Sequence, residues 1–130
     1  MTGNSIPTPV AIAEALSTDL TIDITTIGRT SGQPRRIEIW YLRVDGKYYI
    51  TGTPRPRDWL ANLIANPRFT FHLKETVVAD LDAEATVVTD PDERRRVLTS
   101  MAAEWYRGQV DVDRLVDDAP MVRIAFPGFE

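Results

Sequence analysis

Apolar and polar side chains alternate along several short segments of the chain, and this period of two predicts β-strands with one buried face. In residues 20–26, Leu20, Ile22 and Ile24 alternate with threonine and aspartate. The longest alternation covers residues 77–87, where apolar side chains take every second position and acidic side chains take most of the other face. The acidic face also protects a long strand against pairing with other chains.

Four further segments predict strands, because they alternate in the same way or are rich in β-branched and aromatic residues: 35–43, 47–51, 69–74 and 121–126. The dipeptide Asp45-Gly46 joins the first two of them as a hairpin. In the third, Phe69 and Phe71 point to one face of the strand. His72 falls on the opposite face, where we expect an outward-facing histidine.

Two short helices are expected in the first half of the chain. Residues 8–17 form an amphipathic pattern with Thr8 as its cap and Pro9 at its first position. Residues 58–66 form the second pattern, and Asp58 is its expected N-cap.

A third helix is expected after the run Asp90-Pro91-Asp92-Glu93, which has the pattern of a capping box with proline at the first helical position. We expect this helix to continue to about Arg107, followed by an acidic, irregular segment over residues 109–119. The 3.6-residue period places five side chains on its buried stripe: Val97, Leu98, Met101, Ala102 and Trp105.

These elements predict a mainly β (α+β) fold, an antiparallel barrel of six strands with two or three peripheral helices. The strands do not alternate regularly with helices, which argues against a doubly wound parallel sheet. The length of 130 residues favours one domain spanning residues 1–130, in which residues 1–18 are the N-terminal tail and helix.

The charge is distributed unevenly. The net charge of −4 divides into −3 for residues 1–28, +6 for residues 29–74 and −7 for residues 75–130. Seven of the nine cations in the middle segment are arginines, the side chain best suited to forked contacts with phosphate or carboxylate. A duplex-binding domain is usually basic overall, so a small anionic ligand is the expected partner, with a solvated charged surface as the alternative.

Several classes of chemistry have no residues to support them. The chain has no cysteine and a single histidine, which leaves neither a thiolate site nor a histidine cluster, and we expect no metal. It shows no nucleophile elbow, phosphate-binding Walker motif or dinucleotide fingerprint. No apolar run reaches the length of a membrane span and no secretory signal is visible, so a cytoplasmic protein is expected.

The remaining candidate is an anion-binding rim. The turn between Gly28 and Gly32 is bracketed by glycines, which would expose backbone amides in a phosphate-binding nest, and Arg29 and Ser31 add side-chain donors. Turns of this composition are more often only turns.

Arg55 and Arg57 precede the helix at Asp58, whose N-terminal dipole would reinforce anion binding unless Asp58 itself takes the amides as N-cap. Trp59 could stack on a planar ring or anchor the helix to the core.

Three runs in this region resemble the deazaflavin-dependent nitroreductase family, within the flavin and deazaflavin oxidoreductases: T-T-I-G-R-T-S-G-Q-P-R-R, I-W-Y-L-R-V-D-G-K-Y-Y-I-T-G-T and R-D-W-L-A-N-L-I-A-N-P-R-F-T. The resemblance covers about residues 20–88 in the family's order. It implies a split β-barrel of six or seven mostly antiparallel strands that binds 8-hydroxy-5-deazaflavin (coenzyme F-420). It further implies that the phosphate and glutamyl tail lie along the basic rim.

The resemblance also implies site residues. The family's phosphate loop matches Gly28, Arg29, Ser31 and Gly32, followed by the basic Arg35. Its central strands match Tyr41 and Tyr49, and the segment near the deazaflavin ring matches Gly52, Thr53 and Pro54. Its loop-and-helix signature matches Arg57, Trp59 and Asn62. The loop of residues 52–57 is shorter here than in many members.

The implied activity is hydride transfer from the reduced coenzyme to an electron-poor acceptor such as a quinone, nitroaromatic or enone. No catalytic residue stands out, and Tyr106 is a candidate proton donor only by its position. Two alternatives stay open: an FMN-binding split-barrel oxidoreductase, and a non-catalytic binding protein for a planar anionic ligand. Split-barrel relatives commonly form dimers, so the resemblance also leaves a homodimer open.

Overall fold

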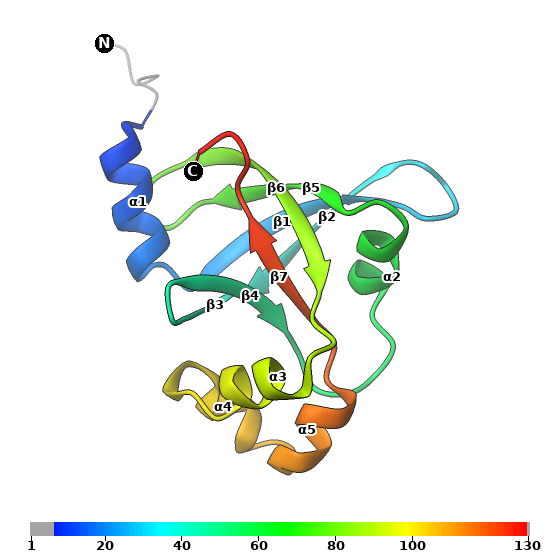
Figure 1. The fold of residues 1–130 in the computed structure, drawn as a ribbon. Helices are drawn as coiled ribbons and strands as arrows, with labels where there is room; N and C mark the ends of the chain where they lie inside the picture. The colour runs from blue at the N-terminus through cyan, green and yellow to red at the C-terminus, as the bar shows by residue number, and fades with distance from the viewer. Residues whose placement is uncertain (1–6, 130) are drawn as a thin grey trace.

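Residues 7–129 are described in the computed structural model, and within them seven strands form one antiparallel sheet that curls into a split barrel (Figure 1). The strands are β1 Thr21–Ile27, β2 Pro34–Trp40, β3 Leu42–Val44, β4 Lys47–Thr51, β5 Arg68–Leu73, β6 Ala79–Val87 and β7 Met121–Ala125. Their order in the sheet is β2-β1-β5-β6-β7-β4-β3. The expected split barrel of antiparallel strands is confirmed.

The expected single strand over residues 35–43 is wrong, because the chain breaks at Tyr41 into β2 and β3. These two strands lie at opposite ends of the sheet order, so the chain crosses from one half of the barrel to the other at this residue. Tyr41 is held there by its own amide, which donates to the Leu20 carbonyl at 3.2 Å, and by its hydroxyl, which donates to the Leu16 carbonyl at 2.9 Å. A single buried aromatic residue therefore sets the corner.

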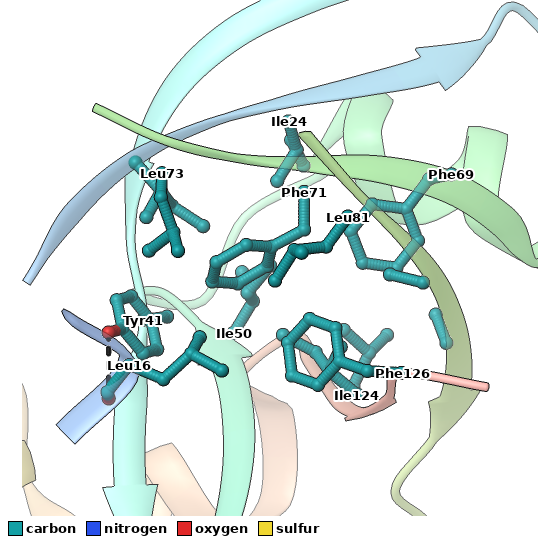
Figure 2. Close-up of a cluster of buried hydrophobic side chains, with 14 of the residues drawn as sticks. Leu16, Ile24, Tyr41, Ile50, Phe69, Phe71, Leu73, Leu81, Ile124 and Phe126 are labelled. Carbon is teal, nitrogen blue, oxygen red and sulfur yellow. Dashed lines mark hydrogen bonds between the residues drawn. The ribbon is translucent and has the colours of Figure 1, made fainter. Parts of the chain in front are cut away.

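The inner face of the sheet carries the main core (Figure 2). Phe71 lies at its centre, edge-on to Tyr41 with ring centroids 5.2 Å apart and to Phe126 at 5.0 Å. Leu81 lies opposite Phe71 in the pairing of β5 with β6, on the same buried face. The alternation that predicts β1, β5 and β6 thus corresponds to real burial.

Helix α1 (Pro9–Thr18) and helix α2 (Asp58–Ala65) form where the sequence predicts them. The Thr8 hydroxyl caps α1 by accepting from the Ala11 amide at 3.1 Å. In Figure 1, α2 lies to the right of the sheet, whereas the three later helices gather below it. Asn62 and Leu63 on α2 are buried, and the helix packs against β1.

The expected long helix after Asp90 is wrong in its second half. The structure has α3 (Pro91–Leu98), the 3-10 turn η1 (Met101–Ala103) and α4 (Glu104–Arg107), because extended backbone at Ser100 interrupts the helix. This break changes which side chains are buried. Val97 and Leu98 are in the core as expected, but Met101 is 87% exposed and Trp105 52%, while Ala103 and Tyr106 are buried instead.

The expected irregular segment 109–119 is also wrong, since residues Val112–Asp118 form α5. Arg94 on α3 fastens this helix: its Nε donates to the Val116 carbonyl at 2.6 Å and its Nη2 donates to the Ala119 carbonyl at 2.6 Å. A charged side chain thus satisfies carbonyls at the C-terminal end of α5, a contact that the spacing of apolar residues does not reveal.

A buried polar cluster joins α3 to the sheet. The Tyr49 hydroxyl donates to the Glu93 carboxylate at 2.7 Å, and Arg123 donates to both oxygens of Glu93 at 2.9 and 2.8 Å. Burial alone would raise the pKa of Glu93, but these hydrogen bonds outweigh it and hold the pKa below its usual value. Burial, together with the bond to Glu93, raises the pKa of Tyr49 to about 12.

We expect this cluster to make stability depend on pH. Because the folded-state pKa of Glu93 is depressed, its contribution is present above the unfolded-state pKa and is lost as the pH falls through the folded-state pKa. Chemical denaturation of the wild type and of Glu93→Gln, from neutral pH down to about pH 3, measures this. The variant should be less stable at neutral pH, and the difference between the two should shrink in acid; a difference that stays constant with pH would contradict the assignment.

Candidate functional site

A hollow of about 820 Å³ is lined by residues of β1 and β2, by the turn between these two strands and by the start of α2. Its walls include four arginines and one acid: Arg29, Arg35, Arg55, Arg57 and Asp58. Four of the nine cations of the basic segment therefore converge on one cavity. We call this cavity the first hollow.

The turn after β1 is held by its own backbone. The Gly28 amide donates to the Gln33 carbonyl at 2.8 Å, the Gly32 amide donates to the Gly28 carbonyl at 2.9 Å, and the Gln33 amide donates to the Ser31 hydroxyl oxygen at 3.1 Å. A side chain at Gly28 would place its Cβ 2.4 Å from that oxygen, and Gly32 has a φ of +69°. The amides of Gly28, Gly32 and Gln33 are therefore used within the turn, which leaves fewer backbone donors for the expected phosphate nest; the nest stays a prediction.

Asn62 ties this turn to α2. It is 4% exposed, and its Oδ1 accepts from both the Arg29 amide and Arg29 Nη1 at 3.0 Å, while its Nδ2 donates to Thr26 at 3.2 Å. Arg29 also reaches Asp58 at 3.2 Å. Asn62 therefore positions the rim, and the charge of Arg29 is partly offset by an acid.

The start of α2 differs from the expectation. Arg57 is the N-cap residue, and no side chain caps the helix. Asp58 is the first helical residue, with its side chain 90% exposed and directed to Arg29, so Asp58 as N-cap is wrong. The uncapped end keeps first-turn amides and the positive end of the helix dipole available at the wall of the first hollow.

Arg57 is the arginine of this group with a buried, unpartnered donor. Its Nη2 donates to the Thr53 carbonyl at 2.8 Å and to the Thr53 hydroxyl at 3.1 Å, but its Nε is buried without a hydrogen-bond partner. Burial, followed by the nearby Arg55, lowers the pKa of Arg57, and Tyr106 opposes the shift. Within residues 7–129 no carboxylate forms an ion pair with Arg57, so its charge is uncompensated by the protein.

Arg57 packs against the backbone after β4. A Cβ at Gly52 would lie 2.9 Å from Arg57 Nη2, so only glycine leaves room for the guanidinium in this position. The match of Gly52 to a family segment thus has a local structural cause, the close approach of a side chain to the backbone.

A second hollow of about 330 Å³ adjoins the first. The two share Arg55, Arg57 and Trp59 in their walls. The second hollow is bounded on its other side by Trp40 from β2 and Trp105 from α4, whose rings meet edge-to-face with centroids 5.5 Å apart. Guanidinium groups and aromatic rings thus face one space.

Most of the predicted site residues come together. The first hollow is lined by seven of them, namely Gly28, Arg29, Ser31, Arg35, Arg57, Trp59 and Asn62. The second is lined by Gly52, Thr53 and Tyr106 together with Arg57 and Trp59. Gly32 and Pro54 line neither: Gly32 shapes the turn, and Pro54 lies in the connection between β4 and α2.

Tyr41 lies outside both hollows. It is 1% exposed, packs on Phe71 in the core and bonds the Leu16 carbonyl (Figure 2), and burial raises the pKa of its hydroxyl. Tyr49 is likewise buried, against Glu93. Neither tyrosine lines a hollow, so we leave Tyr41 and Tyr49 out of the candidate site.

His72 also differs from the expectation. It faces away from Phe71 but is only 6% exposed, with Nδ1 2.7 Å from the Asp80 carboxylate and Nε2 2.7 Å from the Thr25 hydroxyl. It is a satisfied cross-strand histidine covered by its neighbours. No cluster of residues able to hold a metal ion occurs among the described residues.

Sequence reasoning missed part of the second hollow. Trp40 and Trp105 are far apart in sequence, and the 3.6-residue period predicts a buried Trp105. Only the break at Ser100 brings its ring to the surface beside Trp40. Arg55 is visible in the sequence as part of the basic run, and the structure places it in both walls.

Solved structures support the fold. A conserved hypothetical protein from Mycobacterium tuberculosis is 25% identical, with a TM-score of 0.69, over 97% of this chain and 84% of that one. An F420-H2 dependent reductase (FDR-A) is 24% identical, with a TM-score of 0.59, over 82% and 93%. A protein related to general stress protein 26, of the pyridoxinephosphate oxidase family, from Clostridium acetobutylicum is 15% identical, with a TM-score of 0.69, over 91% and 82%.

No curated protein matches the chain significantly. Within residues 7–129, none of the helices combines the length and the apolar character that crossing a membrane requires. The sequence profile of the F420H2-dependent quinone reductases matches residues 8–121, a range that contains both hollows. The chain therefore belongs to the F420H2-dependent quinone reductase family, and it is an oxidoreductase whose cofactor is coenzyme F-420.

Proposed function

We propose that the protein transfers a hydride from reduced coenzyme F-420 to the carbonyl system of a quinone, with the anionic tail of the coenzyme in the first hollow. The observation that carries this proposal is Arg57, a partly buried guanidinium with an unpartnered Nε and no ion pair, in the wall that both hollows share. An uncompensated charge of this kind fits an anionic ligand.

The residues present fit the coenzyme. Its phosphate and glutamyl carboxylates require several cations, and Arg35, Arg55 and Arg57 form no ion pair with other described residues. We assign these arginines, with Arg29 and the Ser31 hydroxyl, to the tail. Gly52 and Thr53 are assigned to the surroundings of the deazaflavin ring, because they line the second hollow beside the cations of the tail site. Trp59 is 7% exposed and packed in the main core, so it is assigned to the inner wall of the site.

The coenzyme, when bound, supplies the hydride. The protein contributes orientation, a wall of aromatic side chains that excludes water, and positive charge. A quinone that accepts a hydride carries negative charge on oxygen and needs one proton to become the hydroquinone. Cations at Arg55 and Arg57 would stabilise that charge.

Tyr106 is the proposed proton donor. It is buried at the wall of the second hollow, and burial raises the pKa of its hydroxyl while Arg57 opposes the shift. The hydroxyl therefore remains protonated at neutral pH and can give its proton to the oxyanion, to be replaced from solvent.

Oxidation of reduced coenzyme F-420 by menadione, followed by absorbance, tests this function. The account predicts saturable turnover with the wild type and a kcat lowered by about 10²-fold or more in Tyr106→Phe, with coenzyme affinity unchanged. Nitroaromatics and enones are the competing acceptors, and kcat/KM across the three classes ranks them. Tyr106→Phe turning over as fast as the wild type would remove the donor role, and no turnover with any acceptor would point to the non-catalytic binding protein.

FMN is the alternative cofactor, because one phosphate could also be held by this rim. The number of unpaired arginines favours a longer anionic tail, since a single phosphate does not require all of them. Competition between FMN and coenzyme F-420 for the purified protein separates the two.

A homodimer remains a proposal for the assembly. A structural neighbour described as a domain-swapped dimer is 24% identical, with a TM-score of 0.59, over 82% of this chain and 79% of that one. Among residues 7–129, β2 pairs only with β1, so no described strand covers its other edge, which could pair with a second copy. Sedimentation velocity over a range of protein concentrations tests this: a single monomer species throughout would exclude it.

A further inference from the structure

The two tryptophans in the wall of the second hollow, Trp40 and Trp105, are exposed to solvent although their side chains are large and apolar. Trp40 is 38% exposed and Trp105 52%, although both are large aromatic side chains with an apolar surface that burial would stabilise. Their rings stand at 79° to one another, and Trp105 in turn meets Tyr106 edge-to-face at 5.2 Å. The three rings form a continuous aromatic strip from the surface to Tyr106, which is buried.

This strip exists because of the break in the helix. An uninterrupted helix from Pro91 would turn Trp105 toward the core, but extended backbone at Ser100 and the 3-10 turn η1 rotate it to the surface beside Trp40. Ala103 and Tyr106 take the buried positions. The local backbone thus gives Trp105 an exposed setting that core packing does not require.

The rest of the wall of the second hollow is polar. Arg55 and Arg57, which also line the first hollow, lie in it with Thr53 and with Glu38, whose carboxylate is paired with Lys74. A ligand that fits both sides is planar and aromatic along one edge or face, and carries oxygen acceptors toward the guanidinium groups. A fused-ring quinone has both features, whereas a simple cyclic enone has the carbonyl without an aromatic ring.

We propose that Trp105 and Trp40 are specificity-determining residues that select planar aromatic quinones over non-aromatic enones at the second hollow. This inference rests on the proposed function, since it assigns the acceptor to that hollow. Edge-to-face and stacked contacts with indole rings favour aromatic ligands beyond the area that they bury. The cationic end then orients the carbonyl oxygens toward Arg57 and the hydroxyl of Tyr106.

The test is binding of menadione to the protein loaded with oxidised coenzyme F-420, measured by calorimetry so that no turnover is needed. Trp105→Leu should raise the Kd of menadione by about tenfold, while Trp105→Phe, which keeps an aromatic ring, should stay within about threefold of the wild type. The Kd of the coenzyme should be the same in all three proteins. Met101→Ala, an exposed apolar change in the neighbouring turn and outside both hollows, is the matched control and should change nothing.

Steady-state kinetics give a second readout. In Trp105→Leu the KM for menadione should rise about tenfold with kcat little changed, and the ratio of kcat/KM for menadione over cyclohexenone should fall by a similar factor. If Trp105 had only a structural role, Trp105→Leu would lower kcat/KM for menadione and for cyclohexenone by the same factor, and that result would overturn the proposal.

Two other results would also overturn it. One is a Kd for menadione unchanged in Trp105→Leu. The other is a Trp105→Leu protein whose sedimentation coefficient changes while its Kd and KM for menadione do not, which would mean that a second copy of the chain covers the tryptophans. Failure of the proposed function is distinguishable, because it appears as absence of turnover in the wild type with any acceptor.

Discussion

Replacing Arg57 with alanine is expected to weaken the binding of coenzyme F-420 by about 1–3 kcal/mol, or roughly five- to 150-fold in Kd. The guanidinium lies in the wall of both hollows and forms no ion pair within the described chain, and its Nε has no hydrogen-bond partner. A ligand anion would be its main partner, so its removal costs charge-assisted bonds. Equilibrium titration of the purified variant measures the loss.

The controls separate charge from geometry. Arg68→Ala removes a cation from the same basic segment, but Arg68 is 82% exposed in its side chain and lines neither hollow, so its Kd should match the wild type. Arg57→Lys keeps the positive charge but loses the forked donor pair of the guanidinium, so its Kd for the coenzyme should lie between those of the wild type and of Arg57→Ala. Arg29→Ala should also weaken binding by about 1–3 kcal/mol, but it additionally removes the guanidinium bond to Asn62 and the ion pair with Asp58, while the bond from the residue-29 amide to Asn62 stays. An unchanged Kd in Arg57→Ala and Arg29→Ala together would refute the anion-binding rim.

Leu81→Ala is expected to lower the free energy of unfolding by about 2–5 kcal/mol. Leu81 is 8% exposed in the middle of β6, and it lies opposite Phe71 in a core where aromatic rings leave little room for collapse (Figure 2). Loss of its side chain removes buried apolar area and leaves a cavity. Urea denaturation of both proteins measures the difference.

Val78→Ala is the matched control, because Val78 precedes the same strand and is 76% exposed; we expect a change within about 0.5 kcal/mol. Leu81 lines neither hollow, so under native conditions the affinity of Leu81→Ala for the coenzyme should equal that of the wild type. A loss of affinity without a loss of stability would show that the core and the site are coupled in a way that this account lacks.

Strands β1 and β6 could be predicted from the sequence because one face of each is buried and the other is not, a difference that repeats every second residue. That argument succeeds for Ile22 and Ile24 on β1 and for Leu81 on β6. It fails at Tyr41, where an apolar, aromatic run continues through a corner of the barrel. Composition cannot show that corner, since the hydrogen bonds that make it come from Leu16 and Leu20 in another part of the chain.

The helices after Asp90 show a second limit. The cap at Asp90 could be predicted, and its carboxylate accepts from the Glu93 amide at 3.1 Å. The break at Ser100 could not, because Ser100 is an acceptable helical residue and the interruption is stabilised by tertiary bonds, among them Arg107 to the Ser100 carbonyl at 2.6 Å. The residues after the break are rotated about the helix axis as a result, which is why Trp105 is exposed against expectation and Tyr106 is buried.

The site was predictable in its chemistry and less so in its details. Charge asymmetry located the cations, and the structure brings Arg29, Arg35 and Arg57 into one cavity. The expected nest stays a prediction, because a glycine-bracketed turn can also satisfy its own amides, as Gly28 and Gly32 do here. Sequence gives the residue types of a loop, but the direction of its amides depends on the folded backbone.

The most direct test of the central claim is the equilibrium binding of coenzyme F-420 and of FMN to the wild-type protein, each at low and at physiological salt. The account predicts a Kd for coenzyme F-420 on the order of micromolar or tighter, weakening as salt screens the arginines, with FMN bound more weakly. FMN binding more tightly than coenzyme F-420 would contradict the assignment of the rim to a long anionic tail. Salt-independent binding of the coenzyme would contradict the role given to Arg35, Arg55 and Arg57.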